Sequence, residues 1–363
     1  MGGAPGSPAH APAAKPVAVD GDEFIFEGLS ISKGPSKLVA DGQNFVAKLE
    51  DFSKVRLLGK GTHGQVWLVN SRSLGIPMAM KVMELGVIDR KAAKRIVREL
   101  SVLKKATGFE YITALHGAFY KSCNVYILME YMDAGSLDTL LAQHAKAIGG
   151  GIPEPVIAAV GHSALHGLRF LREQLKVMHR DIKPANILVN MSGQFKVCDF
   201  SICAELQSHT FADTYIGTIY YMAPERINPA KDKRYKITAD IWSIGVTLVE
   251  LATGEYPYPR ETDDVFAMLK HIVDGPTPVE SAKFADAGLT ADCTDFCQSC
   301  MHKTPEDRAD HHVLLKHKFL ESATSDDTAE HVIRWLRAVT DSSEGERGDE
   351  DANSDADTKA TNT

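Results

Sequence analysis

The chain has 363 residues, of which 44% are hydrophobic and 24% are charged. This is the balance of an ordinary globular protein with enough residues for a substantial core, and it excludes a wholly disordered chain, a collagen-like chain and a small disulfide scaffold. With 48 Asp and Glu against 40 Lys and Arg, the net charge of −8 disfavours binding to duplex nucleic acid or to an anionic membrane.

Cysteine usage and the lack of long apolar runs favour a reducing, aqueous compartment. Six cysteines are too few for a disulfide framework in a chain of this length. No apolar run approaches the roughly 18 residues of a spanning helix, and the Ala-, Gly- and Pro-rich start has no signal-peptide core. We therefore expect a cytoplasmic protein without a membrane partner. We also expect a monomer with no nucleic-acid partner.

Composition separates a core from two flanking segments. Residues 1–50 are predicted to be a flexible leader, within which Glu23–Ser32 alternates apolar and polar residues and favours an added strand. Residues 341–363 hold eight acidic and two basic residues, a net charge of −6. Most of the net charge therefore lies in a predicted disordered tail.

The segment after the leader is predicted to be β-rich. Short runs with the two-residue period of strands occur at Val55–Leu58, Gln65–Val69, Met78–Met83 and Val125–Met129. A helix over Lys91–Lys105, with an apolar stripe at helical spacing, interrupts them.

After residue 133 the pattern becomes mainly helical. Pro155–Leu175 and Ala239–Thr253 repeat apolar residues at helical spacing. We therefore expect an α+β fold in which a small β-rich lobe with one helix (52–131) precedes a larger, mainly helical lobe (132–320).

A glycine-rich segment lies between the first two predicted strands. Gly59, Gly61 and Gly64 form a G-x-G-x-x-G pattern that enters a strand and not a helix. This favours a hairpin folded over phosphate groups, since glycine lets the backbone approach oxygen atoms closely. The pattern alone is weak evidence, and a tight hairpin without a ligand is the alternative.

A lysine and a glutamate in the next two elements are predicted to pair. Lys81 lies on a strand among apolar neighbours and can present a single charge to a phosphate. Glu99 lies beside the apolar stripe of the following helix and needs a cation, for which Lys81 is the candidate. The alternative is a solvated surface pair of little energetic value.

The most specific motif is His-Arg-Asp-Ile-Lys-Pro-Ala-Asn over residues 179–186. It places a carboxylate (Asp181), a cation (Lys183) and a carboxamide (Asn186) on one loop, and these suit a base, a charge stabiliser and a metal ligand. Asp199 follows the next strand-like run and can chelate a Mg²⁺ ion that bridges phosphates.

In these motifs the sequence resembles the eukaryotic protein kinases over about residues 52–320. Ala-Pro-Glu at 223–225, Asp-Ile-Trp at 240–242 and Arg308 follow in the family's order. The resemblance implies a bilobal kinase fold that uses ATP and Mg²⁺. It also implies a structural pair between Glu225 and Arg308, and a structural role for Asp240.

The resemblance assigns roles to the motif residues that carry the chemistry. Asp181 would accept the proton of the substrate hydroxyl, and Lys183 would steady the moving phosphoryl group. Asn186 and Asp199 would hold magnesium.

The same resemblance predicts the nucleotide contacts. Lys81 would bind the α- and β-phosphates of ATP, and Glu99 would orient Lys81. Met129 would be the gatekeeper, and Glu130 and Met132 would offer backbone groups to adenine. The other residues predicted to contact ATP are Leu58, Gly59, Gly61, Gly64, Val66 and Ala79.

Several segments are more similar to the mitogen-activated protein kinase (MAP kinase) kinases. They are Ile-Val-Arg-Glu-Leu at 96–100, the run from Met129 to Asp138, Cys198 directly before Asp199, and Tyr-Met-Ala-Pro-Glu-Arg at 221–226. This resemblance implies a dual-specificity kinase that phosphorylates a downstream MAP kinase and is activated by an upstream MAP kinase kinase kinase.

The segment between Asp-Phe and Ala-Pro-Glu carries Thr210 and Thr214. Thr214 stands three residues before Gly217, where the family places an activating site. Phosphate groups there would add charge that a cation such as Arg180 can capture, so we expect phosphorylation at both threonines to order the loop. The alternative is that threonine is simply common in loops.

The sequence departs from the family at Ser201, where glycine usually follows Asp-Phe. Serine restricts the loop, since the free φ of glycine is lost. We expect activity because Asp199 is intact. A pseudokinase scaffold that binds ATP without turnover is one alternative, and another Ser/Thr kinase of the same STE group is a second.

Residues 321–340 are predicted to form a C-terminal docking helix. Val332, Trp335, Leu336 and Val339 form an i, i+3, i+4, i+7 stripe. The stripe resembles the family's docking segment for upstream kinases. The alternative is a helix packed on the large lobe.

Two groups of candidate metal ligands are predicted to have other roles. Cys293, Cys297 and Cys300 share one helical face, and small apolar side chains facing a core explain them better than zinc. A second group, predicted to lie on the surface, comprises His311, His312 and His317.

Overall fold

A computed structural model of the chain describes residues 18–20, 23–26, 29–32, 34–40, 43–61, 64–72, 74–84, 90–201, 203–205, 219–228, 238–258 and 265–341. The chain divides into two compact units. The first comprises residues 1–100 and 115–130, and the second comprises residues 101–114 and 131–363.

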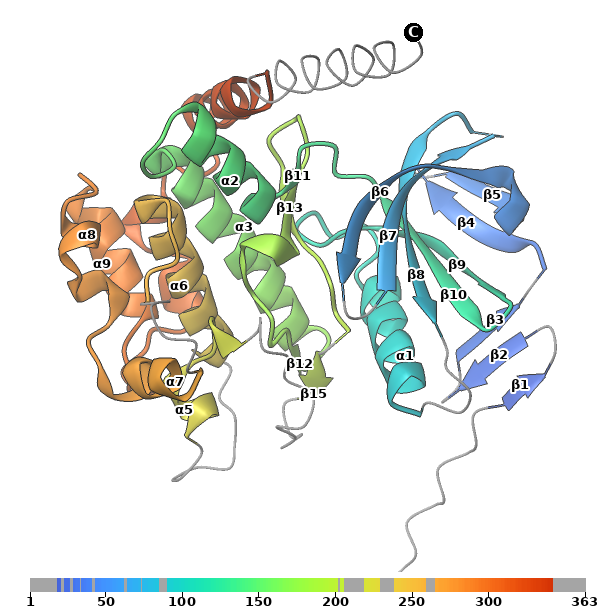
Figure 1. The fold of residues 1–363 in the computed structure, drawn as a ribbon, viewed down its shortest axis with the longest axis horizontal. Coiled ribbons are helices and arrows are strands. Elements are labelled where there is room, and N and C mark those ends of the chain that lie inside the picture. The colour runs from blue at the N-terminus through green and yellow to red at the C-terminus, as the bar shows by residue number, and fades with distance from the viewer. Residues whose placement is uncertain are drawn as a thin grey trace, which may run out of the picture. The chain divides into compact units, whose positions relative to one another are not determined.

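The first unit is built on a five-stranded antiparallel sheet (Figure 1). Its strand order is β6-β7-β8-β10-β9. The bounds are β6 Phe52–Gly61, β7 Gly64–Ser71, β8 Pro77–Glu84, β10 Asn124–Glu130 and β9 Leu115–Lys121. Helix α1 (Arg90–Lys105) follows β8, and its predicted stripe of Ile96, Leu100 and Leu103 is buried. The four predicted strands and the predicted helix are therefore present, and β9 is an additional edge strand.

A hairpin of β4 (Ser36–Ala40) and β5 (Gln43–Ala47) covers one face of this sheet. Its Leu38 is fully buried in a cluster with Met78, Met80, Phe119 and Leu128. Met78 and Met80 alternate with Lys81 along β8, so the hairpin packs on the face opposite Lys81.

The β4–β5 hairpin lies in the segment that we expected to be a flexible leader. It is tied to β9, since the hydroxyl of Ser36 donates to the carbonyl of Ala118 at 2.9 Å. This part of the segment therefore belongs to the core of the first unit. Glu23–Ser32 forms two strands, β2 (Glu23–Phe26) and β3 (Leu29–Ser32), in a separate antiparallel sheet with β1 (Ala18–Asp20).

The second unit is mainly helical. Besides a C-terminal helix over residues 326–341, its longer helices are α2 (Leu137–Ala147), α3 (Glu154–Glu173), α6 (Thr238–Thr253), α7 (Val265–Asp274) and α9 (Ala291–Cys300). The shorter ones are α5 (Pro224–Ile227), α8 (Ala282–Ala285) and α10 (His311–Leu314). Single 3-10 turns lie at Leu49–Asp51 in the first unit and at Pro184–Asn186, Pro278–Glu280 and Lys318–Leu320 in the second.

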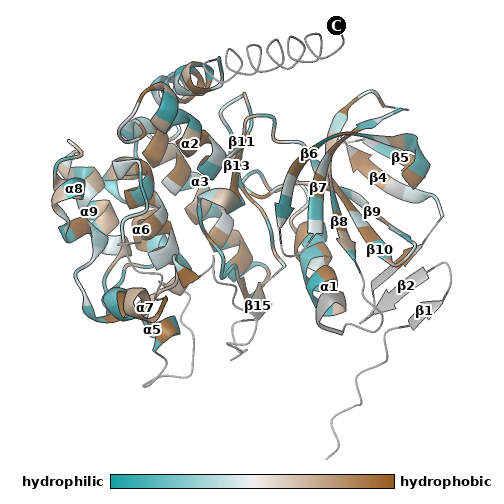
Figure 2. Cartoon of the chain, in the orientation of Figure 1, coloured by the Kyte–Doolittle hydropathy of each residue, from teal (hydrophilic) through white to brown (hydrophobic). Residues whose placement is uncertain are grey.

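Apolar residues recur along α3 and α6 (Figure 2). Every residue from Ala239 to Ala252 is buried, so α6 is the central helix of this unit. No helix in the described part of the chain is both long enough and apolar enough to cross a membrane.

Two small sheets frame the loops of the second unit. One joins β11 (Gly135–Ser136), β13 (Ile187–Val189) and β14 (Phe195–Val197), and the other joins β12 (Val177–Met178) and β15 (Ala204–Glu205). Residues 101–114 belong to this unit because the amide of Thr113 donates to the carbonyl of Val197 at 3.1 Å. The expected α+β class, a β-rich lobe with one helix before a mainly helical lobe, is confirmed.

The C-terminal helix, residues 326–341, packs on its own unit. All four stripe residues, Val332, Trp335, Leu336 and Val339, are buried, and the indole N–H of Trp335 donates to Nδ1 of His144 on α2 at 3.3 Å. The apolar stripe therefore packs against the second unit itself and is not available to a partner. Docking of an upstream kinase by residues 321–340 stays a prediction, and it would use the exposed face of the helix, which includes Glu330, Arg334 and Arg337.

The three cysteines of α9 are core residues, as predicted. Cys293, Cys297 and Cys300 are all fully buried. Burial raises the pKa of the Cys300 thiol, which disfavours the thiolate that zinc requires.

Candidate active site

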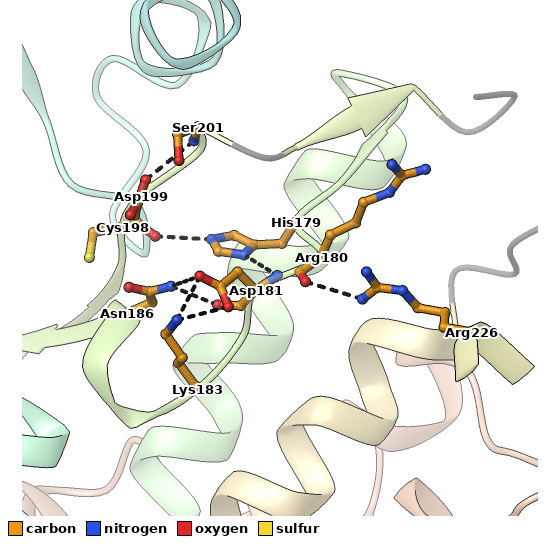
Figure 3. Close-up of polar contacts among 9 residues, drawn as sticks. All are labelled: His179, Arg180, Asp181, Lys183, Asn186, Cys198, Asp199, Ser201 and Arg226. Carbon is orange, nitrogen blue, oxygen red and sulfur yellow. Dashed lines mark hydrogen bonds and ion pairs between the residues drawn. The ribbon is translucent and has the colours of Figure 1, made fainter. Parts of the chain in front are cut away.

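The predicted catalytic loop, whose polar side chains Figure 3 shows, connects β12 to β13 in the second unit. Because β12 pairs with β15 and β13 pairs with β14, both ends of the loop are fixed. The loop closes with the 3-10 turn Pro184–Asn186.

A buried carboxylate from α6 holds the start of this loop. Asp240 accepts the backbone N–H groups of His179 and Arg180, each at 2.8 Å. Arg180 has a φ of 71°, a left-handed conformation that costs a non-glycine residue on the order of 1–3 kcal/mol. Arg226 adds a third tie by donating to the carbonyl of Arg180 at 3.1 Å. The surroundings therefore stabilise a strained backbone directly before Asp181.

The carboxylate of Asp181 lies among donors that fix its orientation (Figure 3). Nζ of Lys183 lies 3.0 and 2.8 Å from its two oxygens. The amide nitrogen of Asn186 donates to Oδ2 and to the backbone carbonyl of Asp181, both at 2.8 Å. The loop thus brings together the three residues that the sequence predicted, and it presents a carboxylate in one orientation, as a general base requires.

His179 connects the loop to the segment that carries Asp199. Its Nε2 lies 3.0 Å from the carbonyl of Cys198, and its Nδ1 lies 3.2 Å from the backbone N–H of Asp181. These partners place the ring proton on Nε2. The ring also meets the buried Phe200 edge to face, with centroids 5.4 Å apart. Sequence reasoning gave His179 and Arg226 no role, although both lie inside the motifs.

Asn186 and Asp199 lie at the ends of two paired strands. The register pairs Ile187 with Val197, and the amide of Cys198 donates to the carbonyl of Asn186 at 3.0 Å. The side-chain nitrogen of Asn186 is directed to Asp181, so its carbonyl oxygen lies on the other side (Figure 3). A carboxamide oxygen and a carboxylate form the hard donor set that Mg²⁺ prefers, so these residues fit the ion that the resemblance implies.

Ser201 is accommodated without strain. Its side chain is buried, its φ is not positive, and its amide donates to Oδ1 of Asp199 at 3.3 Å. The positive φ of the segment, 60°, belongs to Asp199. This conformation therefore does not require glycine at position 201.

In the first unit, Lys81 and Glu99 form the predicted pair. Nζ of Lys81 lies 2.7 Å from Oε1 of Glu99, and the side chains are 8% and 1% exposed. The alternative of a solvated surface pair is therefore wrong. Breaking a buried pair leaves one charge uncompensated, so both partners contribute to holding β8 against α1.

The remaining residues predicted to contact ATP lie on neighbouring strands. The register pairs Gly59 with Val66, Gly61 with Gly64, and Ala79 with Met129. Gly64 has a φ of 132°, and a Cβ there would lie 2.1 Å from the carbonyl oxygen of Val82. The first two strands therefore form the expected hairpin, which requires glycine at this position. Leu58 lies on β6 and Glu130 on β10, while Met132 follows in the second unit.

Two further predictions concern the second unit. Arg308 meets Glu225 through two hydrogen bonds, NH1 to Oε1 at 2.7 Å and NH2 to Oε2 at 3.0 Å, so the expected pair is present. Thr210 and Thr214 lie outside the described residues.

Comparisons with known proteins agree with these motifs. The family model described as "Protein kinase domain" matches residues 52–320. The chain is 37% identical over 286 residues to protein kinase wis1 of Schizosaccharomyces pombe. The aligned region covers 77% of this chain and 45% of wis1. It is also 37% identical over 315 residues to MAP kinase kinase PBS2 of Saccharomyces cerevisiae. This alignment covers 85% of the chain and 44% of PBS2.

A third relative is the dual specificity mitogen-activated protein kinase kinase dSOR1 of Drosophila melanogaster. The chain is 36% identical to it over 298 residues, covering 76% of this chain and 72% of dSOR1. The chain thus spans less than half of the length of wis1 and PBS2 and most of the length of dSOR1.

Proposed function

The chain belongs to the protein kinases, and within them to the mitogen-activated protein kinase kinases. From this membership we propose that it is an ATP-dependent dual-specificity kinase. It transfers the γ-phosphoryl group of ATP to a threonine and a tyrosine in the activation loop of a downstream MAP kinase. The observation that carries the proposal is the oriented carboxylate of Asp181, held by Lys183 and Asn186 in a chain with these relatives.

The residues divide the work as follows. Asp181 accepts the proton of the attacking hydroxyl, and Lys183, already beside that carboxylate, offsets negative charge on the phosphoryl group. Lys81 binds the phosphates of ATP in an orientation set by Glu99. Asn186 and Asp199 would hold Mg²⁺, which would supply positive charge against the phosphates. Positioning and charge stabilisation supply the rate enhancement, with no covalent intermediate.

Phosphosite mapping tests the specificity. With ATP and Mg²⁺, an inactive MAP kinase that carries Thr-x-Tyr is expected to be labelled on both the threonine and the tyrosine, and a generic basic protein only weakly. Mass spectrometry of both substrates gives the readout. Equal labelling of the two proteins without phosphotyrosine would favour the alternative, which is that the chain is another Ser/Thr kinase of the STE group.

Activation is proposed to depend on Thr210 and Thr214. In the double variant Thr210→Ala/Thr214→Ala, incubation with an upstream MAP kinase kinase kinase should leave activity at its basal level, because the loop gains no phosphate to pair with cations. Initial rates before and after incubation measure this. Ser208→Ala in the same segment is the matched control and should be activated normally. Full activation of the double variant would refute the two-threonine switch.

A further inference from the structure

Two histidines and a glutamate converge on the second unit, outside the candidate active site. Glu173 is the last residue of α3, and His311 and His312 open α10. Nε2 of His311 and Nε2 of His312 lie 3.0 and 3.2 Å from the same atom, Oε1 of Glu173. The residues are 138 positions apart in the sequence, so only the fold brings them together.

The structure corrects the prediction of a surface position for His311, bears it out for His312, and leaves His317 partly buried. His312 is exposed, with 61% of its side chain accessible, but the side chain of His311 is only 2% exposed. Its Nε2 contacts Glu173, and its ring lies beside that of His312, with the two ring centroids 4.1 Å apart. One imidazole is thus held in place, and the other closes the cluster from the solvent side.

We propose that Glu173, His311 and His312 form a binding site for a transition-metal ion of the Zn²⁺ type. Zinc binds imidazole nitrogen and carboxylate oxygen at about 2.0–2.2 Å, so neighbouring ligand atoms of a tetrahedral site lie about 3.3 Å apart. The measured separations of 3.0 and 3.2 Å are close to that edge length, and all three ligand atoms lie within 4.8 Å of one another. The three ligand atoms therefore already lie close to a coordinating arrangement.

The donor types select the metal. Two imidazoles and one carboxylate suit Zn²⁺, Cu²⁺ or Ni²⁺, whereas Mg²⁺ and Ca²⁺ prefer oxygen ligands. Three protein ligands also leave one coordination position for water, and the exposed His312 places that position toward solvent. In the described part of the chain, no other group of three such residues meets the same distance limit.

Arg172 acts against metal binding. Its NH1 donates to Nδ1 of His311 at 2.9 Å, which places the ring proton on Nε2, the atom that the metal needs. In the original chain, binding therefore requires that this proton move to Nδ1 and that the guanidinium turn away, so that water accepts the Nδ1 proton. Outer partners of this kind change metal affinity by about 10–100-fold. Arg172→Gln is thus expected to tighten the site, because an amide oxygen can accept the Nδ1 proton.

Calorimetric titration of the full chain with Zn²⁺ tests the proposal. We expect one site that is lost, or weakened more than about tenfold, in His312→Gln and in Glu173→Gln. His331→Gln is the matched control: this histidine lies 3.6 Å from a single carboxylate, that of Asp327, and the variant should bind as the original chain does. Because His312 is exposed, its substitution should leave the melting temperature without metal unchanged.

The direction of the Arg172→Gln effect distinguishes a metal site from nonspecific zinc binding. The proposal requires that Arg172→Gln bind zinc more tightly and that added zinc raise its melting temperature further than that of the original chain. It is wrong if His312→Gln keeps the original affinity and stoichiometry, or if Arg172→Gln fails to tighten binding. Neither readout depends on kinase activity.

Discussion

Replacing Asp181 by asparagine is expected to lower kcat for phosphoryl transfer by about 10²–10⁴-fold, the usual contribution of a general base. The amide has the shape of the carboxylate but cannot accept the hydroxyl proton. Its NH₂ group also faces two donors, because Lys183 and Asn186 both point at this side chain. Binding of ATP should persist, since Asp181 has no assigned contact with the nucleotide. Single-turnover rates and ATP titration measure the two effects separately.

The matched control is Asp295→Asn, since Asp295 is exposed and pairs only with His317 among the described residues. Its kcat should equal that of the original chain. A kcat in Asp181→Asn equal to that of the original chain would show that another group is the base. If the original chain were no faster than Asp181→Asn while both bound ATP, the pseudokinase alternative would be correct.

The backbone conformation at Ser201 supports the expectation that the protein catalyses phosphoryl transfer. Sequence reasoning alone left a scaffold role open because a serine replaced a flexible glycine. In the structure the unusual backbone angle belongs to Asp199, and Ser201 donates to the Asp199 carboxylate from an ordinary conformation. The substitution therefore leaves the proposed metal ligand in place.

Local patterns were sufficient to predict the elements that carry the site. The alternation in Met78–Met83 and the helical stripe through Ile96 and Leu100 placed Lys81 and Glu99 facing each other, and the structure confirms that pair. Strand β9 was not predicted, because Gly117 interrupts its apolar alternation. The β4–β5 hairpin was assigned to the leader together with the Ala-, Gly- and Pro-rich start of the chain, although Leu38 is fully buried.

Contacts between side chains and backbone were beyond sequence reasoning. A carboxylate that accepts two backbone N–H groups, as Asp240 does, leaves no periodic pattern in either segment. The convergence of Glu173 with His311 and His312 has the same origin. In both cases the partners meet only after the helices have packed, so residue types alone could name candidates but not their neighbours.

Removing the guanidinium of Arg308 is expected to destabilise the second unit strongly. Its side chain is fully buried, and besides Glu225 it donates to the carbonyls of Thr238 at 2.8 Å and His302 at 3.0 Å. It also lies 5.2 Å from the ring centre of Trp242. Arg308→Met should lower the free energy of unfolding by about 3–5 kcal/mol, because it leaves a partly buried carboxylate and two carbonyls without their donor.

Urea denaturation or thermal melting measures this loss, with each kcal/mol shifting the midpoint temperature by about 2–4 °C in a unit of this size. Arg308→Lys should recover little, because an ammonium cannot form the two-pronged contact. The double variant Arg308→Met/Glu225→Met should recover part of the loss, since the unpaired carboxylate is gone while the two carbonyls still lack a donor.

Arg337→Met on the exposed face of the C-terminal helix is the matched control and should change stability by no more than about 0.5 kcal/mol. A loss in Arg308→Met no larger than in this control would mean that water replaces the guanidinium without cost. A double variant less stable than Arg308→Met would mean that the Glu225 carboxylate is stabilised by other partners. Partial recovery would instead show that the recovered share of the loss comes from the uncompensated Glu225 carboxylate. The pair would then help to attach α5 to the segment before α10.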